Sequence, residues 1–341
     1  MNSVARKNLF IAIGLVVGLL FIEVGQPGSY TVFILTTIFM YACLASSLDL
    51  LVGLAGRMSF AHAAFFGIGA YICALTMIHW HLAFPVAALA GVVATGIIAL
   101  LVGALTIRLE GMYFALATTA LGVSFASVIE LNNLIGTTGG ASGLAGIPTV
   151  SYLSTPKQFY LLFLVLLVLG LLVKVGISES RIGSRLVAQR DDEELALTLG
   201  VRTNRYKVFA FVISSCLAGL TGAGFALFFG SLAPSDFDIW SSFNVVVWVL
   251  VGGAGTLLGP LLGTALLWTV PQLLNWNPDV NLIIYGLLLI VVIEFRRGGI
   301  MGILSSGVGI LRSYRDRRKK PGEEETTESQ NVGQPSLAPK T

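Results

Sequence analysis

The sequence predicts an all-α, polytopic membrane protein with about eight to ten transmembrane helices. Hydrophobic residues make up 55% of the 341 positions and charged residues only 11%, and the mean hydropathy is +0.84. A soluble domain carries about 25% charged residues. Apolar runs of about 20 residues, the length that crosses a bilayer, recur along most of the chain. These observations argue against a soluble helical protein.

The apolar segments are separated by stretches that contain Gly, Pro or charged residues. Residues 1–29 are expected to form a first span with its lead-in, which we interpret as uncleaved because Gly25-Gln26-Pro27-Gly28 is a poor cleavage site. Residues 30–300 form the expected transmembrane domain. The predicted apolar segments are 9–24, 30–52, 58–78, 83–106, 112–131, 159–177, 208–231, 243–270 and 281–295.

Positive charge orients these segments, because Lys and Arg concentrate in cytoplasmic loops. With a cytoplasmic N-terminus, the inside loops are 53–57, 107–111 and 178–207, and the outside loops are 25–29, 79–84, 132–158 and 232–242. The outside loops then hold only Lys157 of the 21 Lys and Arg residues. The basic tail should also be cytoplasmic, which requires 243–270 to enter from outside, break at its Gly- and Pro-containing centre and return.

Two Gly-rich breaks interrupt the apolar pattern, Val52-Gly53-Leu54-Ala55-Gly56 and Val251-Gly252-Gly253-Ala254-Gly255. Broken hydrophobic segments in corresponding positions of two halves are typical of a transport site at a repeat interface. By this topology the first break faces the cytoplasm and the second faces the outside, so we expect two pseudo-repeated halves of inverted topology. The alternatives are chance similarity of a few small residues and glycines selected for close helix packing. The candidate pathway residues are Asp49, Gly53, Gly56, Arg57, Ser59, His62, Phe65, Phe66, Gly252, Gly253 and Gly255.

These residues suggest how a polar solute would pass. A half-helix N-terminus at either break carries unpaired N–H groups and partial positive charge, which suit a substrate carboxylate. Asp49 is the candidate acceptor for an ammonium group, but a carboxylate within a span costs about 2.5–3.5 kcal/mol. A structural pairing of Asp49 with Arg57 is therefore the equal alternative. For His62, Phe65 and Phe66, packing in the core is the alternative to gating.

The long inside loop 178–207 contains a predicted short helix. Apolar residues recur every three or four positions up to Leu199, Asp191 and Asp192 favour a first turn, and Gly200 ends the helix. An amphipathic helix of this kind fits a groove on a partner protein. A solvated, charged loop is the alternative.

Several motifs resemble those of ABC importer permeases. The segment ELALTLG (194–200) fits the E-A-A-x-x-x-G signature, with Leu195 in place of its second residue. The stretch SLDLLVGLAGRMSFAHAAFFGIGAY (47–71) resembles permeases of branched-chain amino acid ABC importers, as do residues 137–148, 207–227 and 249–267. The chain departs from that family at Ala61, where Gly is common, and at Arg57, where Gln or Leu is common.

The resemblance implies a permease subunit of the bacterial inner membrane that forms the translocation pathway, is not an enzyme and binds no cofactor or metal. ATP would bind to partner subunits, since the chain lacks a G-x-x-x-x-G-K-[ST] phosphate loop. The implied partners are a homologous permease subunit, two cytosolic ATPase subunits and a periplasmic substrate-binding protein; no motif predicts a nucleic-acid partner. The implied ATPase-coupling helix comprises Ala188, Arg190, Asp191, Asp192, Glu193, Glu194, Ala196, Leu199 and Gly200.

The longest outside loop, 132–158, is rich in Gly, Thr and Ser. The resemblance implies that a binding protein delivers substrate here, so that Thr138, Gly139, Gly140 and Ser142 border the periplasmic entrance. Turn formation alone is the alternative. Residues 301–341 begin with a basic juxtamembrane segment suited to anionic membrane lipid and continue with a composition typical of disorder.

The implied substrates are branched-chain or other hydrophobic amino acids, although related permeases carry urea or other small amides. An ion-coupled secondary transporter shares broken helices and inverted repeats, but it would lack a docking helix and would need no ATP. An intramembrane enzyme is a third alternative, yet His62, His79 and His81 are too separated for a convincing metal site.

Overall fold

The computed structural model describes residues 28–106, 108–109, 111–131 and 135–274, together with the isolated positions 14, 18, 286, 287 and 290. The predicted segments 9–24 and 281–295 therefore fall almost entirely outside the described residues. The basic juxtamembrane segment and the predicted disordered tail (301–341) lie wholly outside them.

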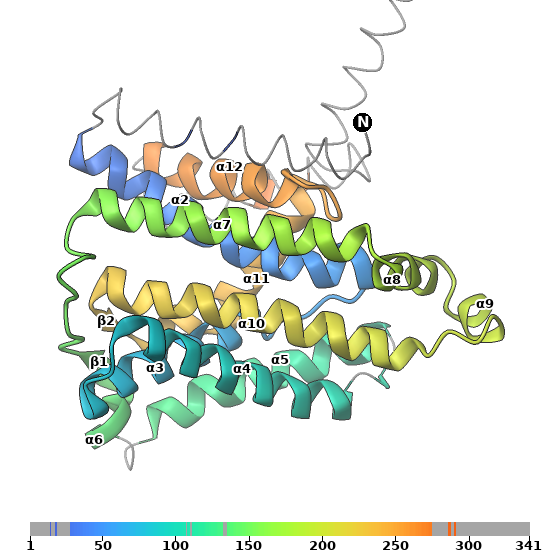
Figure 1. The fold of residues 1–341 in the computed structure, drawn as a ribbon, viewed down its shortest axis with the longest axis horizontal. Helices are drawn as coiled ribbons and strands as arrows, with labels where there is room; N and C mark the ends of the chain where they lie inside the picture. The colour runs from blue at the N-terminus through green and yellow to red at the C-terminus, as the bar shows by residue number, and fades with distance from the viewer. Residues whose placement is uncertain are drawn as a thin grey trace, which may run out of the picture.

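Six described helices are long and apolar enough to cross a membrane, and they run roughly side by side (Figure 1). Their positions confirm six of the predicted spans. They are α2 with its π-helical extension η1 (Ser29–Asp49 and Leu50–Leu54), α3 (His62–Trp80), α4 (Phe84–Thr106), α5 (Gly111–Glu130), α7 (Pro156–Ser178) and α10 (Thr203–Phe229).

Shorter elements lie at the two ends of this bundle. Figure 1 shows α8 and α9 at one end and α6, β1 and β2 at the other, and we refer to these as the α8 end and the β1 end. The short elements are α6 (Ile135–Thr138), the 3-10 helix η3 (Gly140–Ser142), β1 (Leu144–Ala145), α8 (Arg181–Asp191), α9 (Glu193–Thr198), β2 (Ser231–Leu232) and the 3-10 helix η4 (Pro234–Phe237).

The loops alternate between the two ends as the sequence predicts. At the α8 end, the Arg57 guanidinium donates to the Leu109 carbonyl oxygen at 2.6 Å and pairs with Glu193 at 3.4 Å, so that three predicted inside loops meet. At the β1 end, β1 and β2 form an antiparallel pair that joins two predicted outside loops. The chain therefore crosses the bundle once with each long helix.

The segment predicted to enter and return is a helical hairpin of α11 (Ile239–Gly252) and α12 (Gly259–Leu274). A side chain on Gly252 would overlap the Gly259 backbone, and one on Gly263 would overlap the Trp248 carbonyl, so the two helices run antiparallel in close contact. Gly253, with φ 114°, begins the reversal. The predicted reversal is confirmed over these residues, while entry from the outer face and return to it stay a prediction.

Close backbone contacts hold the centre of the bundle together. A side chain on Gly69 of α3 would overlap the backbone of Gly219 on α10, and a Cβ on Gly91 of α4 would lie 2.8 Å from the Gly69 carbonyl oxygen. Small residues at such contacts let membrane helices gain van der Waals packing, which replaces the hydrophobic driving force available in water.

The outer face of α4 carries an apolar stripe that suits contact with lipid. Its side chains recur at three- and four-residue spacing, as one face of a helix requires. Each is more than half exposed: Leu89, Val93, Ile97, Leu100, Leu101 and Leu105.

Candidate functional site

The two Gly-rich breaks meet each other at the α8 end of the bundle. A Cβ atom on Gly53 of η1 would lie 2.5 Å from the Gly255 Cα atom in the turn between α11 and α12. Real Cβ atoms do not approach other atoms so closely, so glycine at position 53 permits this contact. The juxtaposition of the breaks agrees with the predicted shared site, but the two breaks lie together and do not face opposite sides as expected. The inverted repeat itself stays a prediction.

Asp49, the last residue of α2, lies just before the first break and contacts both the second break and helix α7. Its Oδ1 atom accepts a hydrogen bond from the Gly255 N–H at 2.7 Å, and its Oδ2 atom forms an ion pair with Lys174 of α7. The Lys174 ammonium also donates to the Thr256 carbonyl oxygen at 2.5 Å. The carboxylate thus has the partner that a charge within a membrane requires.

The alternative pairing of Asp49 with Arg57 is wrong. The helix ends after η1, and Gly56, with φ 67°, turns the chain, so Arg57 points toward Leu109 and Glu193. Sequence reasoning missed Lys174. A signal was present, because Lys174 is a lone charge within the predicted span 159–177, where an ionisable residue implies a buried partner.

Helix α8 contacts the first break directly. The Arg190 guanidinium donates to the Gly53 carbonyl oxygen at 2.6 Å and also contacts the Asp191 carboxylate. The aliphatic part of Arg190 passes over Gly56, where a Cβ would lie 2.5 Å from the Arg190 Cγ atom. A predicted coupling residue and two predicted pathway residues therefore meet.

Glu193 connects α9 with two further parts of the bundle. Its carboxylate pairs with Arg57 at 3.4 Å and with Lys207 near the start of α10. Both cations are shielded, with side-chain exposures of 8% and 2%. Ion pairs that are partly withdrawn from water are less screened than surface pairs, so they anchor the first turn of α9.

The predicted coupling helix 188–200 is in fact two helices. Asp192 has extended backbone angles (φ −153°, ψ 107°) and accepts a hydrogen bond from the Leu195 N–H, so it caps α9 and separates it from α8. Ala188, Arg190 and Asp191 accordingly belong to α8, while Glu193, Glu194 and Ala196 belong to α9. Gly200 follows α9 with φ 78°, as the predicted stop requires.

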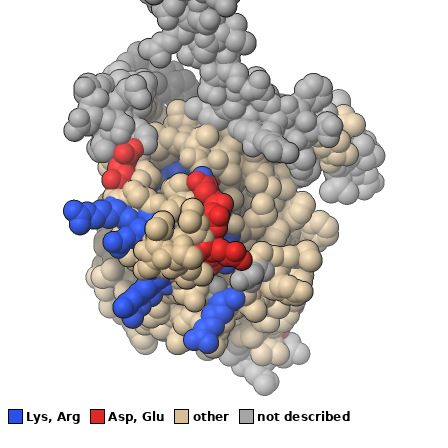
Figure 2. Space-filling view, turned by 90° about the vertical axis from the view of Figure 1, so that its right-hand side faces the viewer, with Lys and Arg blue, Asp and Glu red and all other residues tan. Residues whose placement is uncertain are grey.

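Figure 2 looks at the α8 end and shows acidic and basic side chains gathered there. Of the Lys and Arg residues in the described ranges, only Lys157 lies at the other end, while Lys174 is buried inside the bundle near the α8 end. Those at this end are Arg57, Arg108, Arg181, Arg185, Arg190, Arg202, Arg205 and Lys207.

The remaining pathway candidates near the first break are buried in the bundle. Phe65 packs edge-on against Phe211, and Phe66 packs against Phe225. Ser59, fully buried, accepts a long hydrogen bond of 3.3 Å from the Ala61 N–H. His62 is also fully buried, and neither ring nitrogen has a partner among the described residues. Phe65 and Phe66 thus have the packing contacts that the alternative interpretation expected.

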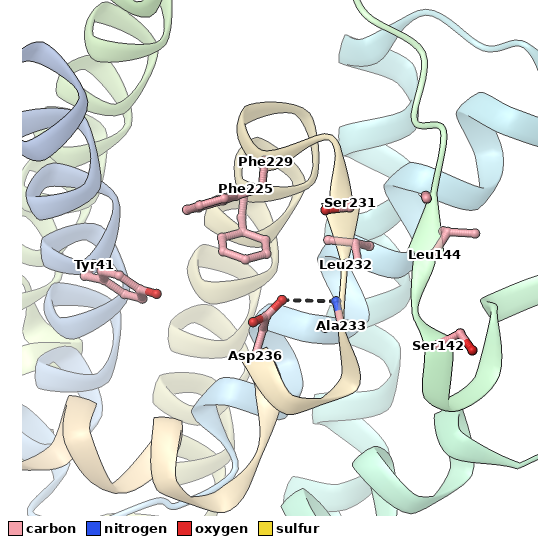
Figure 3. Close-up of a pocket in the computed structure, with 10 residues that line it drawn as sticks. Tyr41, Ser142, Leu144, Phe225, Phe229, Ser231, Leu232, Ala233 and Asp236 are labelled. Carbon is pink, nitrogen blue, oxygen red and sulfur yellow. Dashed lines mark hydrogen bonds between the residues drawn. The ribbon is translucent and has the colours of Figure 1, made fainter. Parts of the chain in front are cut away.

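At the β1 end, a cavity of about 420 Å³ opens between α2, α10, η4 and the β1–β2 pair (Figure 3). Ser142, a predicted entrance residue, lines it. Thr138 lines a separate apolar cavity beside α3 and α5. Gly139 and Gly140 line neither cavity. Gly139 packs closely on Gly143, and Gly140 is buried.

Sequence reasoning missed the cavity residues Tyr41, Phe225, Phe229, Ser231 and Asp236.

Comparison with known proteins identifies the family. The family model described as "Branched-chain amino acid transport system / permease component" matches residues 30–293. The chain belongs to this family.

Curated relatives of this permease carry consistent names. It is 28% identical to the high-affinity branched-chain amino acid transport system permease protein LivM of Escherichia coli, over 88% of this chain and 76% of the relative. It is 25% identical to the corresponding LivH protein of Salmonella typhimurium, over 77% and 91%. It is 27% identical to the autoinducer 2 import system permease protein LsrC of Yersinia pseudotuberculosis, over 60% and 62%. No solved structure matches the chain.

The two sites of this permease lie at opposite ends of the bundle. The network of Asp49, Lys174 and Arg190 joins α2, α7, α8 and the tip of the α11–α12 hairpin at the α8 end. The cavity beside Tyr41 and Asp236 leaves the β1 end open.

Proposed function

We propose that the chain is the pathway-forming subunit of an ATP-driven importer for branched-chain or other hydrophobic amino acids. The family match over residues 30–293 carries this proposal. The names of the LivM and LivH relatives support the substrate class. The proposal places the α8 end and both termini in the cytoplasm, in agreement with the basic residues at that end.

Helix α9 is the proposed docking site for the ATPase. Leu195, Leu197 and Leu199 are 57%, 53% and 75% exposed, whereas Ala196 is buried against the bundle. The three leucines lie among charged side chains at an end that lipid tails would not cover. Exposed apolar side chains with a polar rim are typical of protein-binding surfaces, and a short helix of this kind fits a groove.

The contacts of α8 and α9 suggest how docking would reach the pathway. Arg190 holds the Gly53 carbonyl, and Glu193 holds Arg57 just beyond the same break. A rigid displacement of α8 and α9 by an ATPase would therefore move the first break. The contact between Gly53 and Gly255 would pass this movement on to the tip of the α11–α12 hairpin. Packed elements of this kind switch between discrete arrangements rather than deform continuously.

The other implied partners complete the proposed importer. A homologous permease subunit would pack beside this chain, and a substrate-binding protein would deliver solute at the β1 end, where Ser142 borders the open cavity. ATP would bind to the ATPase subunits and not to this chain.

Uptake in proteoliposomes tests the proposed function. The chain is reconstituted with its ATPase, partner permease and binding protein, and accumulation of labelled L-leucine is followed with internal or absent ATP. We expect accumulation only with ATP, and no loss when a protonophore and ionophores collapse the ion gradients. Accumulation driven by an ion gradient without ATP would overturn the proposal.

A matched pair of leucine variants tests the docking surface. Leu199→Ala should weaken ATPase binding about tenfold, the size expected when one well-placed apolar contact is lost from an interface. Leu105→Ala is the control, because Leu105 is similarly exposed, at 79% against 75%, but lies on the apolar face of α4. Equal ATPase affinity for both variants would remove α9 from the interface.

A further inference from the structure

The cavity at the β1 end has the size of a small-molecule site. Its volume of about 420 Å³ falls within the range of about 300–1,000 Å³ typical of ligand pockets. Its wall combines elements that are distant in sequence: Tyr41 from α2, Phe225 and Phe229 from α10, and Asp236 from η4. The space is therefore formed by the tertiary fold.

The wall presents aromatic and polar groups to the same space. The rings of Phe225 and Phe229 lie 4.6 Å apart between centroids, which gives one side of the cavity an apolar surface. Figure 3 shows the Tyr41 hydroxyl and the Asp236 carboxylate pointing toward each other across the cavity. The hydroxyls of Ser142 and Ser231 lie on the side of the β1–β2 pair.

Asp236 provides the only charge among the described residues that line this cavity. Its Oδ2 atom accepts a hydrogen bond from the Ala233 N–H at 3.0 Å, which fixes the carboxylate at the wall. In the described part of the chain, no donor occupies Oδ1. Partial burial raises the pKa of Asp236 above its ordinary value, the Ala233 N–H lowers it, and the charge of Asp238 raises it further. A cation at Oδ1 would offset this unfavourable burial of negative charge.

Two buried polar groups on α2 and α11 are unpaired among the described residues. The Tyr41 ring packs edge-on against Trp248 of α11, with centroids 5.2 Å apart. The Trp248 indole N–H is buried and has no acceptor among the described residues, and the Ser46 hydroxyl on α2 is in the same condition. Buried polar groups normally have partners, so these two groups are exceptions close to Tyr41 in sequence or in space.

We propose that this cavity binds a primary ammonium group that carries an apolar chain, with Asp236 accepting the ammonium and Phe225 and Phe229 contacting the apolar chain. The inference rests on the proposed function, because hydrophobic amino acids carry both groups. The Ser231 hydroxyl, which points toward the cavity in Figure 3, can donate to the carboxylate of such a zwitterion.

Binding to the purified permease complex in detergent tests the site without transport. The probes are 3-methylbutylamine, which has the ammonium and apolar chain of leucine, and 4-methylpentanoate, which has its carboxylate and apolar chain. We expect the amine at millimolar concentration to raise the melting temperature of the wild-type complex, and the acid not to raise it. Asp236→Asn should abolish the shift, since the amide can still accept from the Ala233 N–H but carries no charge.

Asp238→Asn is the matched control. Asp238 lies two residues away and caps α11 by accepting from the Ser241 N–H at 2.8 Å. Asparagine caps helices as well as aspartate does, so this variant removes one charge from the same loop and preserves the structure. It should keep the amine-dependent shift. Equal loss in both variants, an unchanged shift in Asp236→Asn, or stabilisation by the acid alone would overturn the inference.

Transport separates a failure of this site from a failure of the proposed function. In the reconstituted importer, Asp236→Asn should raise the apparent KM for L-leucine about tenfold or more, the effect expected for loss of a hydrogen bond to a charged group. Asp238→Asn should stay within about twofold of wild type. Wild-type uptake with an unaltered Asp236→Asn KM would overturn the site alone, whereas absence of ATP-driven wild-type uptake would overturn the proposed function.

Discussion

Asp49 of α2 and Lys174 of α7 form an ion pair inside the bundle, with side-chain exposures of 0% and 5%. Both partners also bind the tip of the α11–α12 hairpin, through the Gly255 N–H and the Thr256 carbonyl. Removing one partner of such a pair is strongly destabilising, because the other charge is left buried and unpaired. Replacing both partners costs much less, because no unpaired charge remains.

Replacing one charge of the pair should therefore lower the stability of the permease more than replacing both. Lys174→Met alone should lower the free energy of unfolding by about 3–5 kcal/mol. Adding Asp49→Asn should recover most of that loss, since the amide oxygen can still accept from the Gly255 N–H. Unfolding of the purified permease in detergent measures both variants.

Lys157→Met serves as the control for this pair. Lys157 is an exposed lysine near the other end of the same helix, so its replacement should change stability by no more than about 0.5 kcal/mol. If the double variant is no more stable than Lys174→Met, then Asp49 and Lys174 do not depend on each other as the structure indicates.

A single methyl group at the first break should also be destabilising. In Gly53→Ala, the new Cβ would lie 2.5 Å from the Gly255 Cα atom, so the hairpin tip must shift. We expect a loss of about 1–3 kcal/mol, the usual range for overpacking. In the control Gly170→Ala, on α7, the new methyl group meets no atom within 4 Å.

Helix propensity alone should make the Gly170→Ala control about 0.5–1 kcal/mol more stable. The two glycine variants should consequently shift the thermal midpoint in detergent in opposite directions. A Gly53→Ala protein as stable as wild type would mean that the two breaks do not touch in the membrane.

Local pattern was sufficient to predict the long helices and the hairpin. The apolar runs fix six spans because a membrane-spanning segment must satisfy its backbone within itself. The Gly- and Pro-containing run 251–263 predicted a reversal for the same reason. These features depend on nearby residues, so they can be predicted without knowledge of the rest of the fold.

Tertiary contacts determined what the sequence did not predict. Asp49 pairs with Lys174, 125 positions away, because α2 and α7 pack side by side. The cavity at the β1 end exists because residues 231–232 pair with 144–145, far away in the sequence. The break between α8 and α9 was predictable in part, since Asp192 is a good N-cap residue, but its extended backbone also depends on the anchoring of Glu193.

Glu193 and Glu194 should differ although they are adjacent in sequence. Glu193 pairs with Arg57 and Lys207, so Glu193→Gln should loosen α9 from the bundle. Glu194 is exposed, and Glu194→Gln is the matched control. Hydrogen exchange of the permease without its partners should be faster over residues 193–199 only in Glu193→Gln. Equal exchange in both variants would show that the Glu193 ion pairs do not anchor α9.

His62 provides a test of whether a buried polar group is retained for transport. It is fully buried at the start of α3, and no described residue pairs with either ring nitrogen. An unsatisfied buried polar group costs about 1–3 kcal/mol, so His62→Leu should raise the thermal midpoint in detergent. His79→Leu, at the exposed end of the same helix, should leave it nearly unchanged.

The same His62 variant should then be compared in leucine uptake. A histidine that only fills space gives a more stable permease with normal uptake when it is replaced by leucine. A histidine that meets the passing solute gives higher stability with reduced uptake, the trade-off that active positions show. Because the ring is fully buried and no described residue pairs with either of its nitrogens, we expect the second result. Lower stability of His62→Leu would instead mean that the imidazole has a bonding partner that is missing from its described surroundings.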